Sequence, residues 1–158
     1  MSQSVDTHAP NAPQPKLCDP PKPPPSHTVA LSTSVDGNNS ITIVGNGGWT
    51  VPAGQAATHF NFTLSDTSGA NVQFAGLDTA DNMTTCPPPG SGNASGQIVG
   101  VTTNNNGPNK TASFTDNNSN PSTNGPMNVS YQWNFSCDSS HTVQPFDPII
   151  SNGGRVSS

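Results

Sequence analysis

Glutamate is absent from this chain of 158 residues, and lysine and arginine together occur only four times. Leucine also occurs only four times, so residues that favour helices are scarce. Only 29% of the residues are hydrophobic and 8% are charged, and the polar residues are mainly Asn, Ser and Thr. Disordered chains of low hydrophobicity are usually highly charged, whereas Asn, Ser and Thr suit turns and strand surfaces. The composition therefore predicts an all-β protein.

Positive charge and long apolar runs are also scarce, which limits the partners. The formal net charge is −5, and no Lys or Arg lies between Lys22 and Lys110. A nucleic-acid-binding face needs clustered Lys and Arg, so we expect no nucleic-acid partner. No apolar run approaches the roughly 20 residues that cross a bilayer, so we expect no membrane span. Met1 precedes no basic and then apolar signal sequence. The expected location, outside the cell or on its surface, then requires another export route or a signal that has been removed.

Residues 1–27 contain eight prolines and almost no apolar side chains. Proline fixes φ and removes an amide donor, so this segment favours polyproline II and is unsuited to a sheet interior. We predict an extended arm over 1–27, followed by a β-sandwich domain over 28–158. The arm is either a solvated tail or a segment that docks on a neighbouring subunit. The candidate docking residues are Leu17, Cys18, Pro20, Pro21, Pro23, Pro24 and Pro25.

Strand signals recur along residues 28–158. In the clearest one, over 127–137, Tyr131, Trp133 and Phe135 alternate with polar residues, and this period of two indicates a half-buried central strand. Other short strand patterns are separated by turns rich in Gly, Asn and Asp. They cover 29–35, 41–44, 49–51, 60–64, 72–76, 98–103, 112–115 and 143–150. Short strands without intervening helices predict an antiparallel sandwich of about eight strands.

The three cysteines allow several pairings. A disulfide between Cys86 and Cys137 would pin the loop that starts at Cys86 to the sheet, and Cys18 would then be free to bond another chain. Alternatively, Cys18 could pair with Cys86 or Cys137 and hold the arm against its own domain. In a reducing compartment all three could be free thiols.

Metal-binding and catalytic motifs are absent from the sequence. The histidines lack the spacing of zinc sites, and the stretch from Asp116 starts like a calcium loop but has Pro121 and Met127 where that loop needs Gly and Glu. No nucleophile motif selects among the Ser, His and Asp residues. We therefore expect no enzyme, no cofactor, no metal and no catalytic residue.

The sequence shows two resemblances to known β-sandwich proteins. The pattern Tyr131, Trp133, Phe135, Cys137 resembles a late strand of an immunoglobulin-like sandwich, although Cys86 lies in a proline loop and Phe135 stands where the tyrosine corner would be. Trp49 would be its earlier core tryptophan. The segments 41–43, 49–51, 60–66 and 146–152 are similar to small bacterial β-sandwich proteins of the DP-EP type. This resemblance implies an immunoglobulin-like fold and no assigned activity.

The predicted function is a structural subunit of a homo-oligomeric or filamentous assembly, held by edge strands and the arm. One alternative is a secreted or surface adhesion module. Its long Asn-, Ser- and Thr-rich loops at 91–97, 104–109 and 116–125, with an exposed Trp49, would bind a carbohydrate or protein ligand. Another alternative is a virion decoration protein. Deleting 1–27 would abolish oligomers held by the arm and leave ligand binding by loops intact.

Overall fold

The structure is a computed structural model, and it describes residues 24–119 and 125–154. The candidate arm residues Leu17, Cys18, Pro20, Pro21 and Pro23 lie outside the described residues. The described residues form ten strands and no helix, so they contain no helix that could cross a membrane. The strands are β1 (Ser26–Val35), β2 (Ser40–Val44), β3 (Trp49–Val51), β4 (Thr58–Ser65), β5 (Gln73–Asp81), β6 (Ile98–Asn104), β7 (Asn109–Asp116), β8 (Met127–Ser136), β9 (Thr142–Val143) and β10 (Ile149–Asn152).

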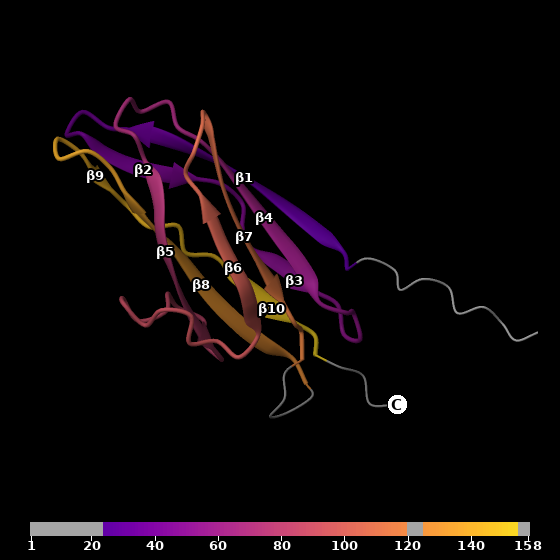
Figure 1. The fold of residues 1–158 in the computed structure, drawn as a ribbon. Coiled ribbons are helices and arrows are strands. Elements are labelled where there is room, and N and C mark those ends of the chain that lie inside the picture. Colours follow the sequence, from indigo (N-terminus) through magenta and orange to yellow (C-terminus); the bar gives the residue numbers. More distant parts are fainter. Residues whose placement is uncertain (1–23, 120–124, 155–158) are drawn as a thin grey trace, which may run out of the picture.

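The strands form two sheets, and the all-β prediction is confirmed (Figure 1). One sheet has the strand order β6-β7-β4-β1-β2-β9 and curls into a half-barrel, and the other has the order β3-β10-β8-β5. The predicted antiparallel pairing is wrong for three neighbours, because β1 with β4, β2 with β9 and β3 with β10 are parallel. After the β1–β2 hairpin the chain crosses to the other sheet as β3 and returns as β4 on the far side of β1. Such a crossover leaves β4 parallel to β1.

Strand positions largely follow the alternation in the sequence. The predicted strand over 127–137 is β8, and it lies inside the four-stranded sheet between β10 and β5. The predicted strand over 143–150 is instead split into β9 and β10, because Pro145 and Pro148 have no amide hydrogen to donate to a ladder. β1 begins at Ser26, two residues before the predicted start of the domain, and Ser26 pairs with His59 of β4.

Trp133 of β8 is fully buried and joins the two sheets. Its ring lies 5.6 Å from the ring of Phe62 and 6.3 Å from that of Phe114, both in the six-stranded sheet, and 5.2 Å from Phe74 of β5. The neighbouring Tyr131 donates its buried hydroxyl to the carbonyl oxygen of Gly47 at 2.8 Å. Burial of these aromatic rings supplies a large hydrophobic contribution to the stability of the sandwich.

Candidate functional site

Trp49, the predicted ligand contact, lies on the edge strand β3 and is 43% exposed. The ring of His27 stacks on it with centroids 3.9 Å apart, and His27 also packs edge-on against Phe60 at 5.5 Å. Partial burial lowers the pKa of His27, so the imidazole is neutral near pH 7 and stacks as an uncharged ring. We call His27 and Trp49 the aromatic platform; it joins β1 of one sheet to β3 of the other.

The Pro-rich segment reaches the domain beside the aromatic platform. Pro24 and Pro25 are exposed and directly precede β1, and the carbonyl oxygen of Pro25 accepts a hydrogen bond from the amide of His59 at 2.8 Å. His27 follows Pro25 by two residues. The fold thus brings together two features that are far apart in the sequence, the predicted arm and Trp49.

The edge strands of both sheets are poorly suited to pair with a strand of another molecule, which weakens the prediction of assembly through edge strands. Along β5, the side-chain amide of Asn105 exchanges hydrogen bonds of 3.0 and 2.9 Å with the backbone of Phe74, and the amide of Thr79 donates to Gly92. β6 is interrupted by a bulge between Val99 and Thr102. β9 has two residues, and β3 has three and is followed by Pro52, which has no amide hydrogen. Capping, bulges and short length all oppose the addition of a further strand.

A groove of about 330 Å³ crosses β4, β7 and β6 on the outer face of the six-stranded sheet. None of the described residues that line it has an ionisable side chain, although the chain carries a net charge of −5. The hydroxyls of Thr102 and Ser113 lie 2.7 Å apart within it. Strand pairing places the outward polar side chains in two rows, Asn61–Ser113–Thr102 and Thr63–Thr111–Asn104. Sequence reasoning missed this groove, because outward Thr, Ser and Asn positions have the pattern of an ordinary solvated strand face.

The predicted surface loop at 91–97 is tied to β5 through two carboxylates, of which Asp78 is buried and Asp81 is half-buried. Asp78 is only 4% exposed, and its carboxylate accepts hydrogen bonds from the amides of Gly90 (3.0 Å) and Gly92 (2.6 Å) and from the side chain of Asn134 (2.8 Å). Three residues farther on, Asp81 accepts from the hydroxyl of Ser95 at 2.5 Å. The loop is therefore held against the sheet as part of the folded domain.

Cys86 and Cys137 are free thiols, so the predicted disulfide between them is not formed. Cys137 follows the end of β8 that pairs with the start of β5, whereas Cys86 lies beyond the end of β5 and donates its thiol to the carboxylate of Asp147. Cys137 donates to the carbonyl oxygen of His141 at 3.3 Å. The hydrogen bond to Asp147 raises the pKa of Cys86, and burial raises that of Cys137, so both thiols are protonated and poorly nucleophilic. Cys18 lies outside the described residues.

Asp116, the first residue of the stretch compared with a calcium loop, is fully buried at the end of β7. One carboxylate oxygen accepts from the amide of Asn118 at 3.1 Å and the side chain of Asn152 at 2.9 Å. The other has no hydrogen-bond partner among residues 24–119 and 125–154. Burial raises the pKa of Asp116, so its carboxyl group ionises less readily than one exposed to water. Within the same ranges, no three His, Cys, Asp or Glu residues are grouped to hold a metal ion.

Comparison with known proteins adds no family. A scan against protein-family models and a search of curated proteins both found no match to this chain. The resemblance to DP-EP-type sandwiches therefore stays a prediction. The contacts, burial and charge of the described residues are the basis for a functional proposal.

Proposed function

We propose that this chain is a non-enzymatic structural protein that associates with copies of itself. In this proposal the Pro-rich N-terminal segment of one copy binds the aromatic platform of the next. The observation that carries it is the stack of Trp49 on His27 at 3.9 Å, which leaves an aromatic surface partly exposed. Proline-rich segments dock on aromatic side chains because a polyproline II helix is already extended and loses little conformational entropy on binding.

The position of the Pro-rich segment favours contact between copies. Its last prolines, Pro24 and Pro25, precede His27 by so few residues that they would have to reverse direction to cover the platform of their own chain. Proline restricts such a reversal because it fixes φ. A segment from a second copy meets no such restriction. A contact of this kind is head-to-tail, and repetition of it produces a ring or a filament.

The first prediction concerns the mass of the assembly in solution. We expect the full chain to form oligomers whose mass rises with concentration, and we expect Trp49→Ala to weaken association at least about tenfold, which is ~1.4 kcal/mol. Deletion of residues 1–23 should give a monomer. The measurement is size-exclusion chromatography with light scattering over a range of concentrations. Val99→Ala is the matched control, because Val99 is also 43% exposed and lies on β6. A wild-type monomer at all concentrations, or oligomers unaffected by Trp49→Ala, would contradict the proposal.

We also infer that the fold is a variant of the immunoglobulin-like sandwich of the DP-EP type, at the cell surface or outside the cell. Support comes from two sheets packed around Trp133 and from the segments that carry the resemblance, which include all of β3 and β10 and most of β2 and β4. Edge strands contribute less to assembly than the sequence predicts, because β5 is capped and β6 is bulged. The same contacts suit a filament subunit and a virion decoration protein.

The groove across β4, β7 and β6 supports a second candidate function, the binding of a neutral saccharide. Hydroxyl and amide side chains both donate and accept hydrogen bonds, so they match the hydroxyls of a sugar. The lining residues among 24–119 and 125–154 carry no charge, which disfavours ionic ligands. Its volume of about 330 Å³ is at the lower end of the usual range for ligand pockets.

The second prediction tests this groove with a soluble neutral oligosaccharide, maltohexaose or cellohexaose, as the probe. We expect backbone NMR signals of Thr63, Thr111 and Ser113 to shift on titration. Ser113→Arg should abolish these shifts by filling the groove. Thr42→Arg is the control, because Thr42 is exposed on β2 and does not line the groove. Shifts that persist in Ser113→Arg, or no shifts at millimolar sugar, would exclude the groove as a saccharide site.

A further inference from the structure

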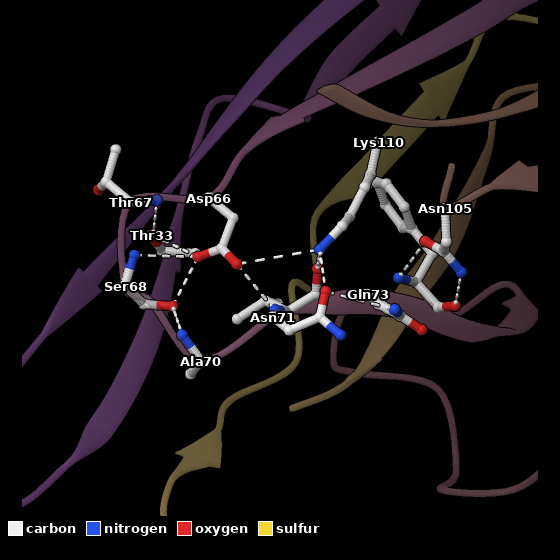
Figure 2. A network of polar contacts seen from close by, with 11 residues as sticks. Thr33, Asp66, Thr67, Ser68, Ala70, Asn71, Gln73, Asn105 and Lys110 are labelled. Carbon is white, nitrogen blue, oxygen red and sulfur yellow. Dashed lines mark hydrogen bonds and ion pairs between the residues drawn. The ribbon is translucent and has the colours of Figure 1, made fainter. Parts of the chain in front are cut away.

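Lys110 is the only lysine or arginine among the described residues, and it is buried, with 7% of its surface exposed. It lies at the start of β7, where it pairs with Leu64 of β4. Its Nζ atom is 2.5 Å from the carbonyl oxygen of Val72, 2.9 Å from Oδ1 of Asn71 and 3.9 Å from Oδ2 of Asp66 (Figure 2). A buried ammonium group is costly even when it is paired.

The side chain of Asn71 presents a polarised carbonyl group to Lys110. Besides Nζ of Lys110, its Oδ1 atom faces Nε2 of Gln73, a second donor at 3.4 Å (Figure 2). Donors directed at a carbonyl oxygen stabilise the negative charge that forms there when a nucleophile attacks the carbon. Asn71 is exposed, so a small leaving group released from it can reach solvent.

Asp66 is the carboxylate nearest to the amine, with Oδ2 3.9 Å from Nζ of Lys110. Its carboxylate accepts hydrogen bonds from the hydroxyl of Thr33 (3.3 Å), from the amide and hydroxyl of Ser68 (3.0 and 2.5 Å) and from the amide of Val72 (2.8 Å). Burial raises the pKa of Asp66, but these hydrogen bonds together outweigh burial and lower it. The carboxylate is therefore ionised and rigidly held beside the Lys110 ammonium.

We propose that Lys110 and Asn71 form an intramolecular isopeptide bond. The Lys110 ammonium passes a proton to the Asp66 carboxylate, an uphill transfer because the hydrogen-bonded carboxylate is a weak base, and the free amine attacks Cγ of Asn71. The carbonyl oxygen takes up negative charge beside the Gln73 amide. The attacking nitrogen gives up its second proton to Asp66 as the intermediate collapses, the bond between Cγ and Nδ2 breaks, and the proton that Asp66 first received leaves with Nδ2 as ammonia. One amine and one carboxamide thus become one secondary amide and ammonia, with no oxidant or other reactant.

The bond would change the mechanical properties of the domain. It would join the loop that follows β4 to the second residue of strand β7, and so close a covalent ring over residues 71–110. A cross-link of this type restricts the unfolded chain in the same way as a disulfide, but it cannot be reduced. The domain would then have a covalent cross-link even though Cys86 and Cys137 are free thiols.

The test is mass spectrometry of the purified full chain under denaturing conditions. We expect the mass of the wild type to be about 17 Da below the mass calculated from its sequence, because the covalent modification releases one ammonia. Digestion with a protease that cleaves after aromatic residues should release a branched peptide that joins Asn71 to Lys110. Lys110→Arg keeps the charge and should have its full sequence mass. Asp66→Asn should slow the loss of ammonia at least about tenfold, since it removes the proton acceptor.

Asn-Gly pairs such as Asn46–Gly47 can also lose ammonia by forming a succinimide, so the branched peptide and Lys110→Arg distinguish the two sources. The proposal is overturned if the wild type has its full sequence mass after prolonged incubation of the folded protein. It is equally overturned if Lys110→Arg shows the same loss, or if no branched peptide is found. The branched peptide is measured on the wild type, so this part of the test remains valid even if Lys110→Arg fails to fold.

Discussion

Replacing Trp133 with alanine is expected to lower the free energy of unfolding by about 3–5 kcal/mol, the usual cost of removing a buried aromatic side chain. Trp133 is fully buried and contacts aromatic rings of both sheets, so its loss leaves a cavity at their interface. Because a domain of this size is stabilised by only about 5–15 kcal/mol, this loss is a large fraction of the total stability. Urea denaturation followed by tryptophan fluorescence or circular dichroism measures the effect.

Two variants on the same strand test this explanation. Trp133→Phe should cost much less than Trp133→Ala, because most of the cavity is filled and the indole N–H has no hydrogen-bond partner among the described residues. Phe135→Ala should also cost less, since Phe135 is only partly buried. A loss in Phe135→Ala as large as that in Trp133→Ala would show that Trp133 is not the centre of the core.

Replacing Asp78 with alanine is expected to lower the free energy of unfolding by about 3 kcal/mol, because hydrogen bonds to charged groups contribute about 1.5–3 kcal/mol each and are not additive. The variant loses three such bonds and leaves the amides of Gly90 and Gly92 without their acceptor. We expect these two amides to exchange hydrogen faster, which detects detachment of the loop from β5. Urea denaturation gives the loss of stability, and hydrogen exchange locates it.

Asp36→Ala is the matched control for Asp78→Ala. Asp36 also accepts hydrogen bonds from two backbone amides, of Asn38 at 2.8 Å and Ser40 at 2.9 Å, but it lies in an exposed hairpin turn. Water can replace the carboxylate there, so we expect a loss of no more than about 1 kcal/mol. Equal losses in the two variants would contradict the role assigned to burial at Asp78.

The effect of Asp78 should also depend on pH. Burial raises its pKa, but the hydrogen bonds from Asn134, Gly90 and Gly92 outweigh burial and hold the pKa below its usual value. A carboxyl with a lowered folded-state pKa stabilises the protein above the unfolded-state value of about 3.9, and this contribution is lost as the pH falls through the folded-state pKa. The stability difference between wild type and Asp78→Ala should therefore shrink below about pH 4. A difference that is constant down to pH 2 would contradict this assignment.

Local patterns in the sequence predicted most strands because side-chain alternation is a property of neighbouring residues. The alternation around Trp133 is enough to identify β8 and its buried face. Prediction was weaker where two prolines interrupt a strand pattern, as between β9 and β10. The antiparallel expectation was wrong for β1 and β4, because pairing depends on where the chain crosses between sheets, which no local pattern records.

The candidate sites were predicted less well. Trp49 was predicted as a possible ligand contact, but its stacking partner His27 was assigned to the arm and not to a strand. The groove across β4, β7 and β6 and the cluster of Lys110, Asn71 and Asp66 were not identified at all. Each of these sites unites side chains from strands or loops that are distant in the sequence, so no spacing within the sequence could indicate them.

Composition and alternation alone therefore determine that the protein is all-β and that a Pro-rich segment precedes its strands, because these properties depend on residue type and on neighbours along the chain. The parallel pairings, the free state of Cys86 and Cys137, the aromatic platform and the burial of Lys110 depend instead on the path of the chain between the sheets. That path results from packing the aromatic core around Trp133, a collective outcome of many distant contacts.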